Sequence, residues 1–357
     1  MALPLTGRSS DSGLALQAGF MAALAEWPES TRPSVVTLDT QNLASESLTQ
    51  VNADICVGPL LKGDIEPLLN VLPPRLPVLL LNTLSDEQQR RYALTRALWQ
   101  YALRPEDEAT SIAQLLSEQA LLTGISISLR NDWAERGRIA FASAFTALGG
   151  HLLIDQSLDP DQTDLNAFMR AALGLELSTR RKDRIAHISG LKLNFVARPN
   201  EQIQFIVYSG PPLFGVQLRQ QCRYWYAEHI PMVAFSDIYS ENALTNADLN
   251  GVFWSDMPWL IQATDAIQKR RQALLNTAFA PYLNKRLFAM GLDAFELAGE
   301  LYLARDHAAT SAWPTQLFDG VTGQLSLTPD GHLKRFTAFA QLSDTGNPRP
   351  VSALVTR

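Results

Sequence analysis

The side chains that could do chemistry are few and far apart in this chain. No two histidines stand at the HExxH or HxxxH spacing that places two imidazoles on one helix face for zinc, and the five are His151, His187, His229, His307 and His332. The GxSxG, GxxxxGKS/T and GxGxxG patterns, which expose a nucleophile or cradle a phosphate, do not occur. We therefore predict no catalytic residue, no metal site and no cofactor, and we expect that the protein is not an enzyme.

The remaining reactive side chains favour structural roles. Cys56 and Cys222 are the two cysteines, and Cys56 lies in the apolar stretch 54–57, which is typical of an inert core thiol rather than a nucleophile. The acidic pair Asp107 and Glu108 follows Pro105 at an expected helix start. Carboxylates there complement the positive end of the helix dipole, so we interpret them as helix-start residues and not as acid-base machinery.

Composition points to an ordinary globular protein of about two domains. The chain has 357 residues, of which 46% are hydrophobic and 18% charged, which excludes disorder, collagen and coiled coil. The net charge of −6 does not suggest a nucleic-acid partner. No apolar run approaches the ~20 residues that span a bilayer. Residues 2–6 follow Met1 without a basic n-region or a long apolar h-region, so we expect no leader within this chain and interpret it as an excised domain.

Short β-branched or leucine-rich runs alternate with longer amphipathic stretches. Strands are expected at 2–6, 34–38, 54–57, 77–81, 98–103, 124–129, 151–154, 203–208, 232–235 and 251–254. This alternation predicts an α/β fold with mainly parallel sheets covered on both faces. The pattern restarts near residue 104, so we predict two doubly wound lobes. A hairpin is expected near the end, with strands at 321–327 and 334–342 around the turn 328–331, because Asp330-Gly331 is a strong hairpin signal.

Polar residues follow many of these strands at their carboxyl ends, where open α/β sheets bind ligands. Two lobes meeting there would form a cleft with hydroxyls, amides and a few charges. Such a cleft suits a polar small molecule, and it equally suits a cleft that has lost its ligand and is held shut by hydrogen bonds. The candidate cleft residues are Ser9, Ser10, Ser12, Lys62, Asn82, Thr83, Arg130, Tyr208, Asp237 and Tyr239.

Two further motifs leave alternatives open. The basic run 180–184 is interpreted as a solvated loop that leads into a helix at 182–191, and its alternative is a contact for an anion or an acidic protein. The aromatic cluster 224–226 cannot point all three rings at the core, because each helical step turns by about 100°. One ring is therefore expected near the surface, either against a neighbouring loop or in a protein interface.

Several motifs carry a resemblance to known families. Residues 3–7 (LPLTG) with Gly13 and Gly19, and residues 320–327 with Asp330-Gly331, resemble the first and last elements of branched-chain amino-acid binding proteins. This implies a type I periplasmic binding protein fold over the whole chain. Four further stretches resemble the C-terminal domain of the LppC/LpoA family: 57–61 (VGPLL), 248–252 (DLNGV), 255–260 (SDMPWL) and 286–295 (RLFAMGLDAF).

The family resemblance implies a function. Its members are outer-membrane lipoproteins that face the periplasm, so the implied role is to bind and activate a class A penicillin-binding protein without catalysis. In the full-length protein the membrane contact would be a lipid anchor that this chain lacks. The alternative is a periplasmic solute-binding protein for an amino acid, a peptide or a cell-wall fragment. One departure weakens that alternative: residues 58–62 (GPLLK) replace a Ser/Thr-rich loop, and leucines cannot hydrogen-bond a ligand carboxylate.

The implied fold also divides the chain. Lobe one would comprise 1–103 plus 237–308, and lobe two 104–236 plus 309–357, joined by three crossovers near 103–104, 236–237 and 307–313. Cys56 and Cys222 then fall in different lobes. Because a disulfide needs Cα atoms within about 7 Å, we predict two free thiols.

Overall fold

Two compact units make up the chain. The structure is a computed structural model that describes residues 1–43, 53–92, 96–159, 161, 164–240, 243–304 and 318–354. Unit 1 comprises Met1–Leu103 and Met257–Phe336, and unit 2 comprises Arg104–Asp256 and Thr337–Arg357. The chain therefore passes between the units three times, and each unit is assembled from segments far apart in sequence.

Unit 1 contains a six-stranded sheet in the order β11-β12-β13-β5-β4-β3. β3 (Cys56–Val57), β4 (Val78–Leu80) and β5 (Leu98–Tyr101) are parallel to one another, and β13 (His332–Phe336) lies parallel to β5. β12 (Gly323–Leu327) and β13 form the expected hairpin, and β11 (Phe318–Gly320) lies at the edge. A separate parallel pair, β1 (Ala2–Leu3) and β2 (Leu38–Asp39), completes the strands described in this unit.

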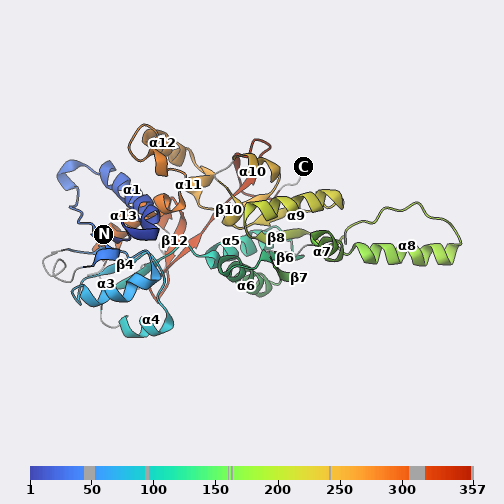
Figure 1. The fold of residues 1–357 in the computed structure, drawn as a ribbon, viewed down its shortest axis with the longest axis horizontal. Coiled ribbons are helices and arrows are strands. Elements are labelled where there is room, and N and C mark those ends of the chain that lie inside the picture. The colour runs from blue at the N-terminus through green and yellow to red at the C-terminus, as the bar shows by residue number, and fades with distance from the viewer. Residues whose placement is uncertain are drawn as a thin grey trace. The chain divides into compact units, whose positions relative to one another are not determined.

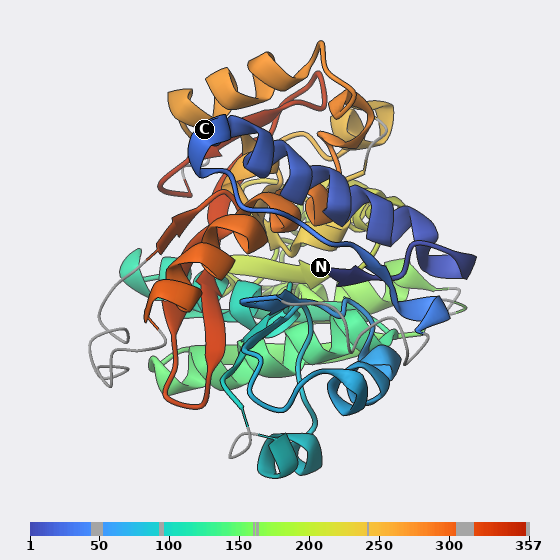
Figure 2. The ribbon, with the colours of Figure 1, turned by 90° about the vertical axis from the view of Figure 1, so that its left-hand side faces the viewer.

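The core of unit 1 is built around two long helices, α1 (Ser10–Glu26) and α13 (Arg286–Ala304). They lie against one another, as Figure 2 shows, and Phe20 of α1 meets Phe295 of α13 edge to face at 5.2 Å. Their buried faces share one apolar cluster with strands β4 and β5 and with Trp259. Shorter helices complete the unit: α3 (Ile65–Val71), α4 (Asp86–Tyr92), α11 (Pro258–Ile261) and α12 (Asp265–Leu274).

Unit 2 contains a seven-stranded sheet in the order β15-β14-β10-β9-β8-β6-β7. Five strands are parallel: β6 (Thr123–Leu129), β7 (His151–Leu158), β8 (Phe205–Ser209), β9 (Met232–Ala234) and β10 (Phe253–Asp256). β14 (Ala338–Leu342) and β15 (Pro348–Val351) add an antiparallel edge. β8 is buried along its whole length, as expected for a parallel strand covered on both faces. The predicted α/β class with mainly parallel sheets is thus confirmed.

The helices of unit 2 connect these strands. They are α5 (Pro105–Glu118), α6 (Asp132–Ala147), α7 (Leu165–Ala172), α8 (Leu175–Ser189), α9 (Pro212–Tyr224) and α10 (Ala243–Asp248), and their arrangement can be followed in Figure 1. α6 starts where a capping residue predicts it, because the Asn131 Oδ1 atom accepts from the Ala134 backbone N–H at 2.9 Å. Phe141 and Phe145 of α6 then pack on the Phe205 ring of β8.

The units differ from the predicted lobes in two places. Residues 237–256, expected in lobe one, belong to unit 2 because β10 pairs with β9 and β14. Residues 318–336, expected in lobe two, belong to unit 1 because β13 pairs with β5. The second and third crossovers therefore lie at 256–257 and 336–337, and the segment 307–313 falls outside the described residues.

One predicted strand, 334–342, is in fact two strands. β13 ends at Phe336 and β14 starts at Ala338, so the chain leaves one sheet and enters another at Thr337. In the sequence, apolar residues continue at every second position from Phe336 to Leu342, which predicts one strand. In the structure, the buried positions change from 333 and 335 in β13 to 340 and 342 in β14. Among the helices that the structure describes, none combines the length and hydropathy needed to cross a bilayer.

Candidate functional site

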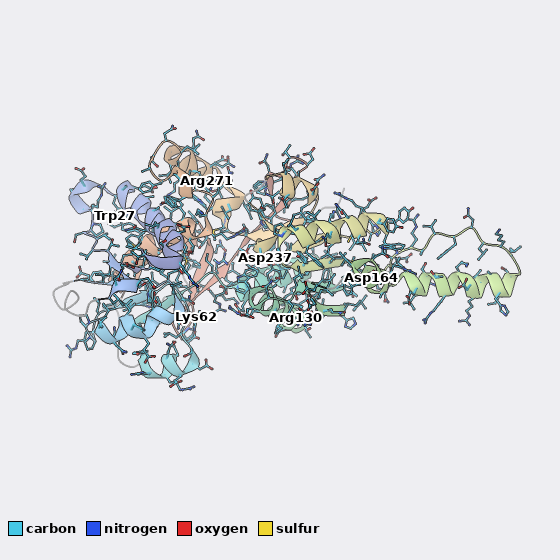
Figure 3. All side chains as sticks on the ribbon, viewed as in Figure 1. Trp27, Lys62, Arg130, Asp164, Asp237 and Arg271 are labelled. Atoms are coloured by element: carbon cyan, nitrogen blue, oxygen red, sulfur yellow. The ribbon has the colours of Figure 1, made fainter. Side chains whose placement is uncertain are left out.

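Six candidate cleft residues lie in unit 1, and all six follow strands as expected. Ser9 ends a 3-10 turn after β1, and Ser10 and Ser12 lie in the first turn of α1, each half-buried. Lys62 follows β3 and is exposed, and Asn82 and Thr83 follow β4. Lys62 is labelled in Figure 3. Their role in ligand binding stays a prediction.

Asn82 has a structural task that the sequence did not suggest. Its Nδ2 atom donates to the Leu60 carbonyl at 2.8 Å, and its Oδ1 atom accepts from the Thr83 backbone N–H at 2.9 Å. Leu60 is 8% exposed and contributes to the unit 1 core. The loop after β3 therefore packs its Leu60 side chain into the core, and Asn82 fixes its backbone by a hydrogen bond.

A cluster of hydrogen bonds around Asp39 joins the residues that follow β1 to those that follow β2. The Asp39 carboxylate accepts from the Thr6 hydroxyl at 2.6 Å, the Asn42 side-chain amide at 2.9 Å, and the Leu5 and Gln41 backbone N–H groups at 3.0 and 3.1 Å. Burial alone would raise the pKa of Asp39, but these hydrogen bonds favour the charged form and lower its pKa to about 2. Asp39 thereby fixes the loop that carries Thr6 toward α1.

The Asp39 cluster predicts a specific dependence of stability on pH. The folded pKa lies below the ordinary value of 3.8, so the carboxylate contributes stability above that value and loses it as the pH falls toward 2. We expect Asp39→Asn to destabilise unit 1 at pH 7 and to match the unmodified chain near pH 2. Denaturant titrations at several pH values measure this difference. Glu29→Gln, at an exposed position without a side-chain hydrogen bond among the described residues, is the control. A difference that does not change with pH would contradict the assignment.

The four candidates in unit 2 also lie at strand ends. The exposed Arg130 guanidinium lies 3.4 Å from Asp159, and the buried Tyr208 hydroxyl donates to the Pro211 carbonyl at 2.9 Å. The Tyr239 ring stacks on Trp254 with centroids 5.0 Å apart. Asp237 lies in a 3-10 turn after β9 and is half-buried, and Figure 3 labels it together with Arg130. Burial raises the pKa of the Tyr208 phenol, so Tyr208 stays protonated.

Sequence reasoning missed a buried carboxylate network in unit 1. Asp293 of α13 accepts from the Val321 N–H at 2.7 Å, and from the Thr322 N–H and hydroxyl at 2.8 and 2.6 Å. The Tyr101 hydroxyl adds a longer bond at 3.3 Å, and buried Arg335 donates to the Thr322 carbonyl at 3.4 Å. Burial raises the pKa of Asp293 to about 6 although the hydrogen bonds act against it. The network joins α13 to β5 and β13, the two strands that lead to crossovers.

A comparable anchor exists in unit 2. Glu108 is 3% exposed, and its carboxylate accepts from the Ser236 N–H and hydroxyl, both at 2.9 Å. The Ser111 hydroxyl, one turn further along α5, accepts from the Thr337 N–H at 3.1 Å. Glu108 lies at the helix start as expected, but its carboxylate binds a residue 128 positions away. Ser111 binds one 226 positions away. No local sequence signal indicates either partner.

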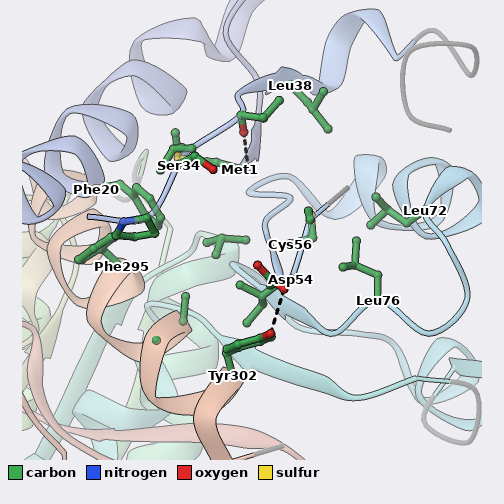
Figure 4. Close-up of a pocket in the computed structure, with 18 of the residues that line it drawn as sticks. Met1, Phe20, Ser34, Leu38, Asp54, Cys56, Leu72, Leu76, Phe295 and Tyr302 are labelled. Atoms are coloured by element: carbon green, nitrogen blue, oxygen red, sulfur yellow. Dashed lines mark hydrogen bonds between the residues drawn. The ribbon is translucent and has the colours of Figure 1, made fainter. Parts of the chain in front are cut away.

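Unit 1 also contains a pocket of about 280 Å³, which the sequence motifs did not predict. It lies between the ends of α1 and α13 and the segments 33–38 and 53–57, and its walls are mainly apolar (Figure 4). At its rim the Tyr302 hydroxyl donates to Asp54 at 2.9 Å. Ligand pockets usually measure about 300–1,000 Å³, so this one suits only a small apolar group.

In the part of the chain that the structure describes, the reactive side chains are not gathered at one site. Among the described residues, no three His, Cys, Asp or Glu side chains are placed to hold a metal ion. Both cysteines are free and buried, as predicted. Burial raises the pKa of Cys56 and raises that of Cys222 to about 11, so both thiols stay protonated and unreactive at neutral pH.

Comparison with known families agrees with this architecture. A family model described as "LppC putative lipoprotein" matches residues 1–345. The chain belongs to the LppC family. Among curated relatives, the penicillin-binding protein activator LpoA of Vibrio cholerae is 26% identical over 356 residues, covering 95% of this chain and 56% of that protein. LpoA of Erwinia tasmaniensis is 26% identical over 334 residues, covering 87% of this chain and 48% of that protein. This LppC chain thus spans about half the length of these relatives.

Solved structures show the same fold. The C-domain of LpoA from Haemophilus influenzae, described as a regulator of PBP1A, matches with a TM-score of 0.66 at 23% identity and covers 98% of each chain. A structure assigned to a branched-chain amino acid ABC transporter of Rhodospirillum rubrum matches with a TM-score of 0.70 at 16% identity, also over 98% of each chain. This LppC family member therefore has the fold of type I periplasmic binding proteins.

Proposed function

We propose that this chain is a non-catalytic domain that binds a class A penicillin-binding protein and stimulates its synthesis of peptidoglycan. The observation that carries the proposal is the LppC match over residues 1–345, joined to relatives whose names describe activators of penicillin-binding proteins. The domain would act in the periplasm. It would be attached to the outer membrane through a lipid anchor, in keeping with the lipoprotein description of the family.

The site geometry supports a binding role over a chemical one. The candidate strand-end residues Asn82, Tyr208 and Tyr239 bond or stack with neighbours in their own unit. The two buried thiols are protonated, because their burial raises each pKa. A surface that works by contact needs a rigid scaffold, and buried anchors such as Asp293 and Glu108 supply one within each unit.

The solute-binding alternative has less support. The loop 58–62 contains no hydroxyl side chain, and its Leu60 packs into the unit 1 core. A thermal-shift screen with amino acids, peptides and cell-wall fragments tests this alternative directly. A specific ligand at 100 times its dissociation constant would stabilise the protein by about 2.7 kcal/mol, and no shift is expected.

The proposal predicts a direct and stimulating complex. We expect the chain to bind the soluble periplasmic part of a class A penicillin-binding protein from the same cell, and to raise its rate of glycan polymerisation or crosslinking. Calorimetric titration measures the binding, and incorporation of labelled lipid II measures the rate. The control partner is a penicillin-binding protein that has only a transpeptidase domain. Absence of association at tens of micromolar, or binding without any change of rate, would overturn the proposal.

A further inference from the structure

The basic run and the aromatic cluster of the sequence lie at the same end of unit 2. The run 180–184 is inside α8 and is not a loop leading into a helix, which corrects the expectation from sequence. After α8 the segment 190–202 returns to β8, and Figure 1 shows that both extend away from the sheet of unit 2. We call residues 175–200 the arm.

The arm carries large apolar side chains that are exposed to solvent. Leu175 is the only buried residue of α8, and it lies where the helix begins. The exposed fractions are 75% for Ile188, 64% for Leu191, 57% for Leu177 and 51% for Val196. Figure 3 shows the side chains of α8 standing out along its length. Single exposed apolar residues are ordinary, but a row on one projecting element is typical of an interaction site.

The arm also concentrates positive charge in an acidic protein. It holds six basic residues and two acidic ones, a net charge of +4, whereas the whole chain carries −6. The basic residues are Arg180, Arg181, Lys182, Arg184, Lys192 and Arg198. Lys182 pairs with Asp183 at 2.6 Å. Within the part of the chain that the structure describes, Arg180, Arg181, Arg184 and Lys192 form no ion pair, so these four charges are available to a partner.

Apolar and cationic side chains share one face of α8. Leu177, Arg181, Arg184 and Ile188 follow one another at steps of four, three and four residues, which places them on the same side of a helix, and all four are exposed. Thr179, Lys182 and Ala186 are half-buried and lie on the opposite side. A helix that lies on a membrane separates its apolar face from its basic face. Arginine mixed with apolar residues is instead typical of protein interfaces.

The aromatic cluster continues this surface at the base of the arm. The Arg198 guanidinium of the return segment lies over the Tyr226 ring at 4.7 Å, and Arg170 of α7 lies over Trp225 at 5.7 Å. Tyr224 and Tyr226 keep 66% and 49% of their surface exposed. Tyrosine and arginine are the residues that most often dominate binding energy in protein complexes.

We propose that the arm, with Tyr224 and Tyr226, is the docking surface for an acidic polypeptide segment that also carries apolar side chains, on the penicillin-binding protein partner. The inference rests on the proposed function and adds the surface and the chemistry of its counterpart. Carboxylates of the partner would accept from the guanidinium groups on α8, and its apolar side chains would cover Leu177 and Ile188. Such a contact weakens with salt because part of it is electrostatic.

Charge reversal on the arm tests the inference. We expect the triple variant Arg180→Glu, Arg181→Glu, Arg184→Glu to weaken binding of the soluble partner at least tenfold and to remove most of its salt dependence. The double variant Leu177→Ser, Ile188→Ser should also weaken binding, with the salt dependence kept. The matched control is Arg8→Glu, Arg75→Glu, Lys285→Glu, which makes the same change of charge at exposed positions of unit 1. Because all these positions are exposed, the melting temperatures should stay within a few degrees.

Each result decides between the proposals. If the partner binds the unmodified chain and the arm variants equally well, the arm inference fails while the proposed function stands. If the unmodified chain does not bind the partner, both fail. Vesicles of equal parts phosphatidylcholine and phosphatidylglycerol test a membrane surface, and sedimentation tests a second copy of this chain. Arm-dependent binding to vesicles, or arm-dependent dimers, with unchanged partner affinity would overturn the inference.

Discussion

Replacing Asp293 by alanine is expected to lower the free energy of unfolding of unit 1 by about 3 kcal/mol or more, because several buried donors would lose their acceptor. The carboxylate accepts four hydrogen bonds from Val321, Thr322 and Tyr101, and Asp293 is 1% exposed. Alanine would leave two backbone N–H groups and two hydroxyls without this acceptor in a site that water does not reach.

The measurement for Asp293 needs a probe of unit 1 alone. Hydrogen exchange of the β12 and α13 amides under increasing urea reports it directly. Glu300→Ala, at an exposed position on the same helix, is the control and should change the free energy by no more than about 0.5 kcal/mol. Equal and small effects of the two variants would show that the network does not support the unit.

Replacing Gly19 by alanine is expected to destabilise unit 1 by about 3 kcal/mol or more. α1 and α13 approach so closely that a Cβ atom at Gly19 would lie 1.9 Å from the Phe288 carbonyl oxygen. The facing Gly291 is equally tight, with its Cβ position 2.1 Å from the Leu16 carbonyl oxygen. Both clashes are with backbone, so no side-chain rotation relieves them and the helices must separate.

Gly299 supplies the matched control on the same helix. A Cβ atom there meets nothing within 4 Å, so Gly299→Ala should stabilise α13 by roughly 0.5–1 kcal/mol through helix propensity. The double variant Gly19→Ala, Gly291→Ala should cost less than the sum of the single variants, because both disrupt one contact. Urea unfolding of the three single variants and the double variant measures these effects. A Gly19→Ala protein as stable as the Gly299→Ala protein would contradict the packing.

Strands and helices of the two units could be predicted where a pattern of neighbouring residues is enough to specify them. Apolar runs such as that of β8 and capping residues such as Asn131 act over a few positions, so composition and period reveal them. Boundaries set by pairing were not predictable. Nothing near Thr337 indicates that the chain changes sheets there, since β13 pairs with β5 and β14 pairs with β10, each far away in sequence.

The candidate sites divide in the same way. The sequence predicted that polar residues follow the strands. The loops after parallel strands lie at the carboxyl edge of the sheet, so this position could be read from the order of the elements. The hydrogen-bond partners of these residues could not be predicted. The bond from the Asn82 side chain to the Leu60 carbonyl is an example. The basic run was visible in the sequence, but its exposure on a projecting helix depends on α8 having almost no neighbours.

By itself the sequence determined the alternating α/β class and the scattering of reactive side chains, because these depend on residue types and on spacings of a few positions. Only the tertiary structure decided where the chain changes sheets, which buried carboxylates hold each unit, and that a basic-apolar helix face is left uncovered. Those features come from contacts between residues far apart in sequence, such as His332 of β13 and Gln100 of β5, which are 232 positions apart, and their free energy exists only once the sheets have formed.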